Sequence, residues 1–300
     1  MADWASINGV AAANVASIAG VAKASCGSAF GLDTPSSGDT ESYLFDGSDE
    51  YIQADAVVTS AANFDWQDDA QSISVWFKTS SVDPAVLWSF GHSSQNSSWY
   101  YLMVKGDTTG GPVDEPYFLI SGFTNTAHLF GKADATTSPN GANGYAWVLE
   151  SDTNGINPAD DAWHHIVITF SGAASTAEAV KMYVDGNYVG YSKSRGSDLN
   201  VSDFSIGVLR KDGANDTEYF FNGHIAQLGM WTSELSSGNV STLYNSGTPL
   251  AVGAALSPVH FYRFGDGDSN GPGTLTDYGS AGQDVAGVNL ESGDIVSVHP

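Results

Sequence analysis

The chain has 300 residues, of which 42% are apolar and only 15% are charged, with 34 glycines and 10 prolines. This composition is that of a globular protein, and it excludes a disordered or a collagen-like chain. The 10 Lys and Arg stand against 34 Asp and Glu, giving a formal charge of −24. Because this charge repels phosphate groups and anionic lipid, we expect no nucleic-acid partner and no membrane partner.

Cysteine content and terminal sequence narrow the class of protein further. Cys26 is the single cysteine, so neither an intrachain disulfide nor a multi-cysteine zinc site is expected. There is no run of about 18 apolar residues that would span a bilayer. No basic segment precedes Lys23, which argues against a secretory signal. If the protein acts outside a cell, we expect another route of release, such as lysis by a virus.

The N-terminal segment consists of two copies of one 11-residue unit, ASINGVAAANV and ASIAGVAKASC, over residues 5–26. A period of 11 fits a right-handed helical supercoil, but the glycine in each unit opposes a helix, and a strand or a repeated turn fits equally well. Two such units cannot bury a core alone. We therefore predict an assembly or docking segment and linker over residues 1–40. The predicted assembly residues are Ile7, Val10, Val15, Ile18 and Val21.

From residue 41 onward, short segments of alternating apolar and polar residues are separated by turns, which predicts an all-β sandwich or jelly roll over residues 41–300. Asp185-Gly186 between two such segments is a strong hairpin signal. The one expected helix is Glu234–Tyr244, capped by Ser233. The predicted strands are Ser72–Lys78, Val86–Phe90, Tyr100–Val104, Tyr117–Ser121, Trp163–Phe170, Val180–Val184, Phe204–Val208, Phe220–Trp231 and Val259–Phe264.

Aromatic residues make up 12% of the chain. Large rings dominate the cores of sandwiches, so we expect the tryptophans that fall within strands to be buried. Trp66 and Trp99 stand beside polar turn residues and are candidates for stacking on a sugar ring. The tryptophans expected in the core are Trp76, Trp88, Trp147, Trp163 and Trp231.

His164 and His165 are adjacent in a predicted strand. Neighbouring residues of a strand face opposite sides, so these two rings cannot chelate one metal ion together. We expect one ring in the core and the other on the surface.

An acidic loop near the C-terminus has the spacing of a calcium site. Asp266, Asp268 and Asn270 alternate, Gly271 follows, and Asp277 stands at the twelfth position. Calcium loops place oxygen ligands at positions 1, 3 and 5, a turn glycine at 6 and a carboxylate at 12. No flanking helices are expected, so the loop is not an EF-hand. Two interpretations remain open: calcium bound by the first three side chains and Asp277, or a tight turn between strands.

Several segments occur in a familiar order. DAWHHIVITFSG and VKMYVDGNYVG are followed by NGHIAQLGMW and a short helix. Together they resemble the concanavalin A-like lectin/glucanase superfamily, in its laminin G-like or pentraxin-like branch, over residues 41–250. The resemblance implies a jelly-roll module that binds glycans or proteins or serves as a structural decoration, with Trp163 buried. It also implies a ligand loop at residues 212–218, and the expected ligand-binding residues are Trp99, Asp212, Asn215 and Asp216.

Glucanases of this superfamily carry two catalytic glutamates in a Glu-x-Asp-x-Glu segment of one strand. Retaining hydrolysis needs two carboxyl groups about 5 Å apart, and alternate residues of a strand provide such a pair. The chain has no such segment, and it has neither a Gly-x-Ser-x-Gly elbow nor a phosphate-binding glycine loop. We therefore expect no enzymatic activity and no catalytic residue.

A second resemblance concerns the sequences at the two ends of the chain. The tail FYRFGDGDSNGPGTLTDYGS is similar to the closing segment of such domains in structural proteins of marine and cyanobacterial phages, and the leading repeats are similar to those that begin other virion proteins. This implies a virion component, as a capsid decoration or a tail or fibre protein, docked through its N-terminal segment. Its partners would be other virion proteins and copies of itself, with a trimer among the expected oligomers. The alternative is a calcium-assisted carbohydrate-binding module that contacts the host surface.

Overall fold

The chain divides into two units, Met1–Gly38 and Asp39–Pro300, in a computed structural model. In the first unit the structure describes four dipeptides, at residues 6–7, 10–11, 17–18 and 21–22. No helix among the described residues is both long enough and apolar enough to cross a membrane. In the second unit the described residues are 39–59, 70–91, 99–106, 116–123, 130–131, 145–149, 155–172, 179–194, 201–210, 217–250, 256–266, 268 and 273–300.

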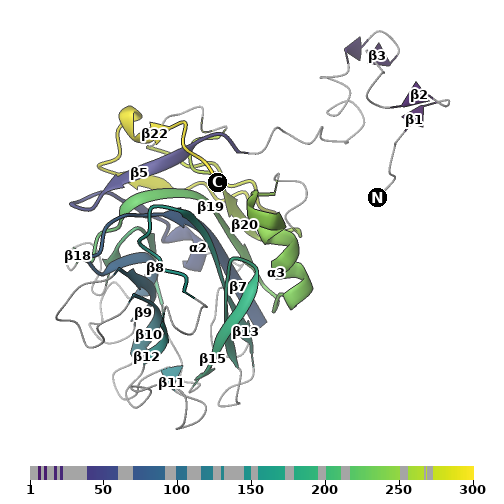
Figure 1. The fold of residues 1–300 in the computed structure, drawn as a ribbon. Helices are drawn as coiled ribbons and strands as arrows, with labels where there is room; N and C mark the ends of the chain where they lie inside the picture. The colour runs from purple at the N-terminus through teal and green to yellow at the C-terminus, as the bar shows by residue number, and fades with distance from the viewer. Residues whose placement is uncertain are drawn as a thin grey trace. The chain divides into compact units, whose positions relative to one another are not determined.

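The two N-terminal repeats form two small antiparallel hairpins with the same register (Figure 1). In the first, Ile7 of β1 (Ser6–Ile7) lies opposite Val10 of β2 (Val10–Ala11). In the second, Ile18 of β3 (Ser17–Ile18) lies opposite Val21 of β4 (Val21–Ala22). The described residues of the repeats are therefore extended strands rather than parts of a helical supercoil. Val15 lies outside the described residues.

The second unit is a sandwich of two antiparallel sheets, which confirms the predicted all-β jelly-roll class (Figure 1). The first sheet has seven strands, and its register is set by inward-facing apolar residues that alternate with outward-facing ones. In spatial order it contains β12 (Tyr145–Leu149), β10 (Tyr117–Phe123), β9 (Trp99–Lys105), β8 (Ala85–Gly91), β16 (Asp203–Ile206), β6 (Tyr51–Gln53) and β21 (Ala286–Val288).

The second sheet has nine strands, and β20 (His260–Tyr262) pairs with β19 beside its main path. A separate two-stranded sheet of β17 (Leu209–Arg210) and β18 (Thr217–Glu218) follows β16. The main path of the nine-stranded sheet is β11 (Phe130–Gly131), β15 (Asn187–Ser194), β14 (Val180–Val184), β13 (Trp163–Ser171), β7 (Ala70–Lys78), β19 (Asn222–Trp231), β5 (Ser42–Asp46) and β22 (Ile295–Val296).

One apolar core fills the space between the sheets. Phe90 of β8 stacks on Tyr100 of β9 with ring centroids 4.4 Å apart, and Phe77 of β7 meets Phe118 of β10 edge-on across the two layers at 6.4 Å. Burying one such phenylalanine contributes about 2 kcal/mol to folding. The short helix α2 (Ala56–Thr59) adds Val57 to this core.

The expected helix near residue 240 is present but begins later than predicted. Helix α3 spans Ser237–Tyr244 instead of Glu234–Tyr244, and its cap is Ser236, not Ser233. The Ser236 Oγ accepts a hydrogen bond from the Asn239 N–H, and the Asn239 side chain accepts one from the Ser236 N–H, which is a reciprocal capping box.

Ser72 of β7 explains the later start of the helix. Its hydroxyl donates to the Ser233 carbonyl at 2.9 Å and accepts from the Leu235 N–H at 2.9 Å. These bonds hold the segment before the helix against the sheet in an extended conformation. The sequence contains no sign of this contact, because Ser72 lies 161 positions away from Ser233.

Both histidines of β13 are buried, so the expectation of one surface ring is wrong. They do face opposite sides, as predicted. His165 faces outward, where it stacks on Trp76 at 4.7 Å and lies parallel to Tyr244 of α3 at 6.2 Å. His164 packs at 5.8 Å from Phe77 of the core. The outer face is buried at this point because the helix covers it.

The predicted core tryptophans differ in burial. Trp76, Trp88 and Trp231 are buried, as expected. Trp163, which the family resemblance implied to be buried, is only partly so, because it begins β13 at the end of the sheet. The side chain of Trp147 lies outside the described residues.

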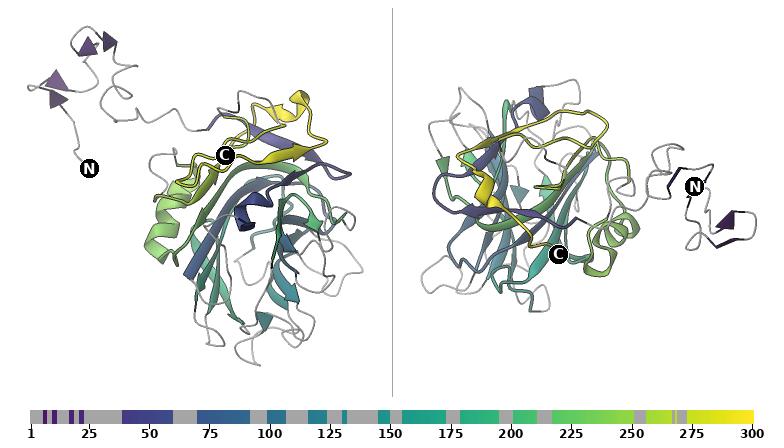
Figure 2. Two further views of the ribbon diagram at one scale, coloured as in Figure 1. Left: turned by 180° about the vertical axis from the view of Figure 1, so that it is seen from behind. Right: turned by 90° about the horizontal axis from the view of Figure 1, so that it is seen from above.

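The C-terminal tail closes one side of both sheets (Figure 2). β21 pairs with β6 of the seven-stranded sheet, and β22 pairs with β5 of the nine-stranded sheet. Leu275 and Val285, which precede β21 and are bridged to each other, belong to the main core. The tail is therefore an integral part of the sandwich and protects two sheet edges from pairing with other chains.

Candidate functional site

A row of polar side chains crosses the outer face of the seven-stranded sheet. Ile52, Phe204 and Phe90 and their neighbours face the core, so the residues that alternate with them face outward. The paired positions of adjacent strands line up across the sheet in one row: Gln53 opposite Ser205, Ser205 opposite Ser89, Ser89 opposite Tyr101, and Tyr101 opposite Ser121.

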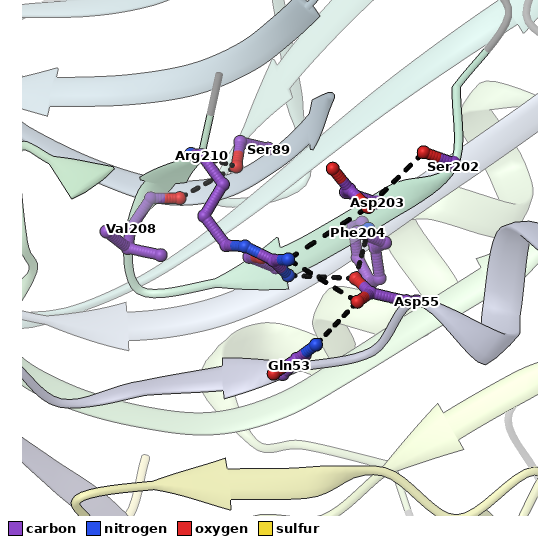
Figure 3. A network of polar contacts seen from close by, with 9 residues as sticks. Gln53, Asp55, Ser89, Ser202, Asp203, Phe204, Val208 and Arg210 are labelled. Atoms are coloured by element: carbon purple, nitrogen blue, oxygen red, sulfur yellow. Dashed lines mark hydrogen bonds and ion pairs between the residues drawn. The ribbon is translucent and has the colours of Figure 1, made fainter. Parts of the chain in front are cut away.

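Arg210 lies against this row and is the centre of a charged network (Figure 3). Its Nη1 donates to Asp55 Oδ1 at 2.8 Å and to Ser205 Oγ at 2.9 Å. Its Nη2 lies 3.4 Å from Asp55 Oδ2 and 4.0 Å from Asp203 Oδ1. The guanidinium also lies 5.9 Å from the centre of the Tyr51 ring. A planar guanidinium matches a carboxylate in this two-pronged geometry.

The hydroxyl group of Ser89 connects the backbone at β17 to the sheet. Ser89 Oγ accepts a hydrogen bond from the Arg210 N–H at 3.3 Å and donates one to the Val208 carbonyl at 2.8 Å. The arginine side chain is only 3% exposed, so its position is determined by contacts with the protein.

Asp55 is the exposed end of this network. Besides Arg210, it accepts a hydrogen bond from Gln53 Nε2 at 2.6 Å and one from the Phe204 N–H at 3.2 Å. Its side chain is 28% exposed, against 3% for the arginine. These four donors take up the roughly four lone-pair sites of a carboxylate. The buried arginine therefore holds in place a carboxylate that reaches the protein surface.

Next to the network, the same face carries an aromatic cluster. Trp99, which is partly buried, stacks on Tyr101 with ring centroids 5.5 Å apart and planes 23° apart. Lys105 Nζ lies 5.6 Å from the centre of the Tyr117 ring, and burial raises the pKa of that tyrosine to about 12. Leu209 of β17 joins this cluster, so the β17–β18 hairpin packs against it.

Of the predicted ligand residues the structure describes Trp99 alone, and it lies on this face. Trp99 lies in the aromatic cluster. The predicted loop joins β17 to β18, whose pairing brings Arg210 opposite Thr217 at the two ends of the loop. Within that loop Asp212, Asn215 and Asp216 lie outside the described residues, as does Trp66.

Arg210, Asp55 and Asp203 were not predicted from the sequence. A weak signal exists, because Arg210 directly follows Val208 and Leu209 in a chain with only 10 basic residues. A charge inside an apolar strand needs a buried partner. The partner could not be identified, because Asp55 lies 155 positions away.

The acidic C-terminal loop has a different arrangement from the one a calcium site needs. Asp266 accepts hydrogen bonds from the Thr40 N–H at 2.7 Å and the Glu41 N–H at 2.8 Å. Asp268 accepts from the Gly265 N–H at 2.9 Å and the Thr276 N–H at 2.8 Å. Asp266 therefore holds the main chain at the start of the sandwich, and Asp268 holds main-chain groups of the tail.

Asp277 is bound in the same way. Its side chain accepts from His260 Nδ1 and from the N–H groups of Phe261, Gly279 and Gln283, each at 2.8 Å. Burial raises the pKa of Asp277, but these donors outweigh it and the net pKa is lowered. Each of these bonds favours the ionised carboxylate.

The described carboxylates of the predicted calcium set do not come together. Among the residues that the structure describes, no group of three or more His, Cys, Asp and Glu side chains could hold a metal ion. Asp266, Asp268 and Asp277 accept hydrogen bonds from main-chain groups, and Asn270 lies outside the described residues. Calcium binding by the chain stays a prediction.

Comparisons with known proteins agree with this architecture. A protein-family model described as the concanavalin A-like lectin/glucanases superfamily, of the laminin G type, matches residues 46–241. No curated protein matches the chain. A candidate carbohydrate-binding protein of Bacteroides ovatus has a similar fold, with a TM-score of 0.51 and 15% identity, over 86% of this chain and 59% of its own.

Two further solved structures are similar at lower scores. The SAP-like pentraxin of Limulus polyphemus, a heptamer, has a TM-score of 0.45 and 14% identity over 69% of this chain and 82% of its own. The CBM40 module of a Ruminococcus gnavus IT-sialidase, bound to α2,3-sialyllactose, has a TM-score of 0.46 and 10% identity over 69% of this chain and 99% of its own. With the family model matching most of the sandwich, the chain belongs to the concanavalin A-like lectin/glucanases superfamily.

Proposed function

We propose that the chain binds carbohydrate at the outer face of the seven-stranded sheet, beside Trp99. The observation that carries this proposal is the partly buried Trp99 ring, stacked on Tyr101 next to the β17–β18 hairpin. A ring held in this way is a rigid apolar surface for a sugar face. The Bacteroides ovatus protein with the same fold is itself a candidate carbohydrate-binding protein, which supports the assignment.

Asp55 would provide the polar part of this recognition. Arg210, Gln53 and the Phe204 N–H hold its carboxylate, and its side chain remains 28% exposed. A sugar hydroxyl that binds here would replace one of the donors that already hold the carboxylate. The pre-oriented carboxylate itself loses little freedom on binding. The proposed activity is binding without cleavage of the sugar.

A glycan array probed with the full chain, with and without added calcium, tests this function. We expect binding to at least one class of glycan and loss of that binding in Trp99→Ala. Leu44→Ala is the matched control, because it removes an exposed apolar side chain from β5. The proposal fails if no glycan binds in either condition, or if Trp99→Ala and Leu44→Ala bind equally to the wild-type hits.

We further propose that the chain is a structural component of a bacteriophage virion, as a capsid decoration or a tail or fibre protein anchored by Met1–Gly38. Its support is the pair of N-terminal hairpins, in which Ile7 faces Val10 and Ile18 faces Val21 in the same register. Two-stranded hairpins are marginal in water on their own. These apolar pairs would be stabilised by contact with another virion protein or with further copies of the chain.

Deletion of residues 1–38 tests the anchoring role. The body has its own core, so the shortened chain should fold with the same thermal stability. We expect it to be missing from purified particles and to sediment as a smaller oligomer than the full chain does. Mass spectrometry of the particles with copy-number counting gives the readout. Incorporation of the shortened chain at the wild-type copy number would contradict the anchor.

A further inference from the structure

A β-bulge turns two tyrosines of β15 toward the same side of the nine-stranded sheet. Tyr188 lies opposite Tyr183 and Tyr191 lies opposite Lys181, although the tyrosines of β15 are three positions apart. In a regular strand, residues three apart face opposite sides. The register shift between β14 and β15 gives β15 one extra residue, Val189, which packs toward the core. Bulges of this kind re-aim side chains.

Both rings reach the surface. Tyr188 is 49% exposed and Tyr191 is 40% exposed. They lie on the outer face of the sandwich, because Lys181, which pairs with Tyr191, alternates with the core residues Val180 and Met182. This outer face belongs to the other sheet from the one that carries Trp99.

Polar and aromatic side chains lie next to the two tyrosine rings. Tyr183 meets Tyr188 at 5.6 Å with planes 65° apart, which supports the ring from its buried side. Lys181 Nζ forms an ion pair with Glu234 Oε1 at 2.9 Å beside Tyr191. Charged groups of this kind are suitable hydrogen-bond partners for hydroxyl groups.

The hairpin that carries the tyrosines is rigidly anchored. Its turn is Asp185-Gly186, with φ values of 49° and 75°. The Asp185 carboxylate accepts hydrogen bonds from His164 Nδ1 at 2.9 Å and from the His165 N–H at 2.8 Å. Gly186 packs against the ring of Tyr244. A surface fixed in this way is ordered before a ligand arrives.

We propose that Tyr188 and Tyr191 form a second carbohydrate contact, a platform for the sugar faces of a neutral polysaccharide. The platform takes its ligand class from the proposed function but uses a different face of the molecule. Phenol rings can pack on the apolar faces of pyranoses, and the neighbouring Lys181–Glu234 ion pair suits their hydroxyl edges. The formal charge of −24 opposes an anionic polymer.

Affinity electrophoresis of the full chain in gels that contain mannan, xylan or a β-1,4-glucan tests this contact. We expect at least one polymer to retard the wild type. Tyr188→Ala/Tyr191→Ala should weaken the interaction about tenfold, in line with the loss of two aromatic contacts. Tyr188→Phe/Tyr191→Phe should keep most of it, because the ring faces remain. Leu44→Ala is the control, since it removes an exposed apolar side chain from β5 of the same nine-stranded sheet.

The outcomes separate the platform from the site at Trp99. Equal retardation of wild type and Tyr188→Ala/Tyr191→Ala, with loss in Trp99→Ala, would overturn the platform and leave the proposed function standing. Binding to acidic glycans alone on the array would overturn the platform in the same way. Absence of any glycan binding would overturn both.

Discussion

Arg210 and Asp55, 155 positions apart in the sequence, form a two-pronged ion pair whose cation is buried and whose carboxylate reaches the surface. The pair joins the β17–β18 hairpin to the end of β6, and it places an oriented acceptor beside the aromatic cluster of the candidate site. The arrangement links the stability of this face to its proposed binding function, because the residue that holds Asp55 is itself held by Ser89 and Ser205.

Replacing Arg210 should destabilise the fold strongly. Arg210→Met leaves the Asp55 and Asp203 carboxylates without their shared cation, and breaking a buried pair from one side costs about 3 kcal/mol or more. Arg210→Lys keeps the charge but loses the two-pronged geometry, so it should lose less. Urea unfolding of both variants measures the difference. A loss below about 1 kcal/mol for Arg210→Met would show that the pair is not structurally important.

His165 should make the fold sensitive to acid. Burial lowers its pKa to about 3 from an ordinary value of 6.5. As pH falls below 6.5, His165 therefore becomes protonated in the unfolded chain but stays neutral in the folded chain. The free energy of unfolding consequently decreases down to about pH 3. The difference in unfolding free energy between wild type and His165→Gln, measured from pH 7 to pH 4, should shrink as pH falls. A constant difference over this range would contradict the assignment.

His164 should behave in the opposite way. Burial lowers its pKa, but Asp185 and Asp160 outweigh the burial and raise the net pKa above 6.5. Its contribution to stability is then fully present below pH 6.5 and is lost as pH rises through the raised pKa. An NMR titration of the histidine ring signals should show this site titrating above 6.5. Asp160→Asn should lower that midpoint, whereas a midpoint unaffected by this change would exclude the proposed pairing.

The turn that anchors the tyrosine platform should not tolerate a side chain. Gly186 has a φ of +75°, and an added Cβ would lie 2.8 Å from Tyr244 Cδ1. We expect Gly186→Ala to cost about 1–2 kcal/mol of stability from the left-handed backbone and the contact together. Gly273→Ala is the matched control, because nothing lies within 4 Å of its added Cβ. Thermal unfolding of the two variants should differ; equal melting temperatures would contradict the packing of this turn.

Sequence patterns recovered the local features of this fold. The alternation in Ser72–Lys78 and Trp163–Phe170 identified two long central strands, and Asp185-Gly186 identified a two-residue hairpin turn. These features depend on neighbours in the sequence. The two or three residues of β21 and β22 carry too short a pattern to be recognised, and they become strands only because β6 and β5 offer partners.

The candidate site shows the limit of such patterns more sharply. Trp99 could be selected because it is an aromatic residue among polar neighbours, whereas Arg210 and Asp55 acquire their roles only when β6 and β17 are brought together. Both histidines of β13 were placed correctly on opposite sides, but the burial of His165 depends on the helix that covers the outer face. Pairings across the sheets are tertiary, and one sequence does not contain them.

A crystal structure of the chain with a glycan identified on the array is the most direct test of the proposed binding site. We predict a sugar ring within about 4 Å of the Trp99 ring. A glycan bound only at a surface away from Trp99 and the β17–β18 hairpin would contradict the assignment of this face.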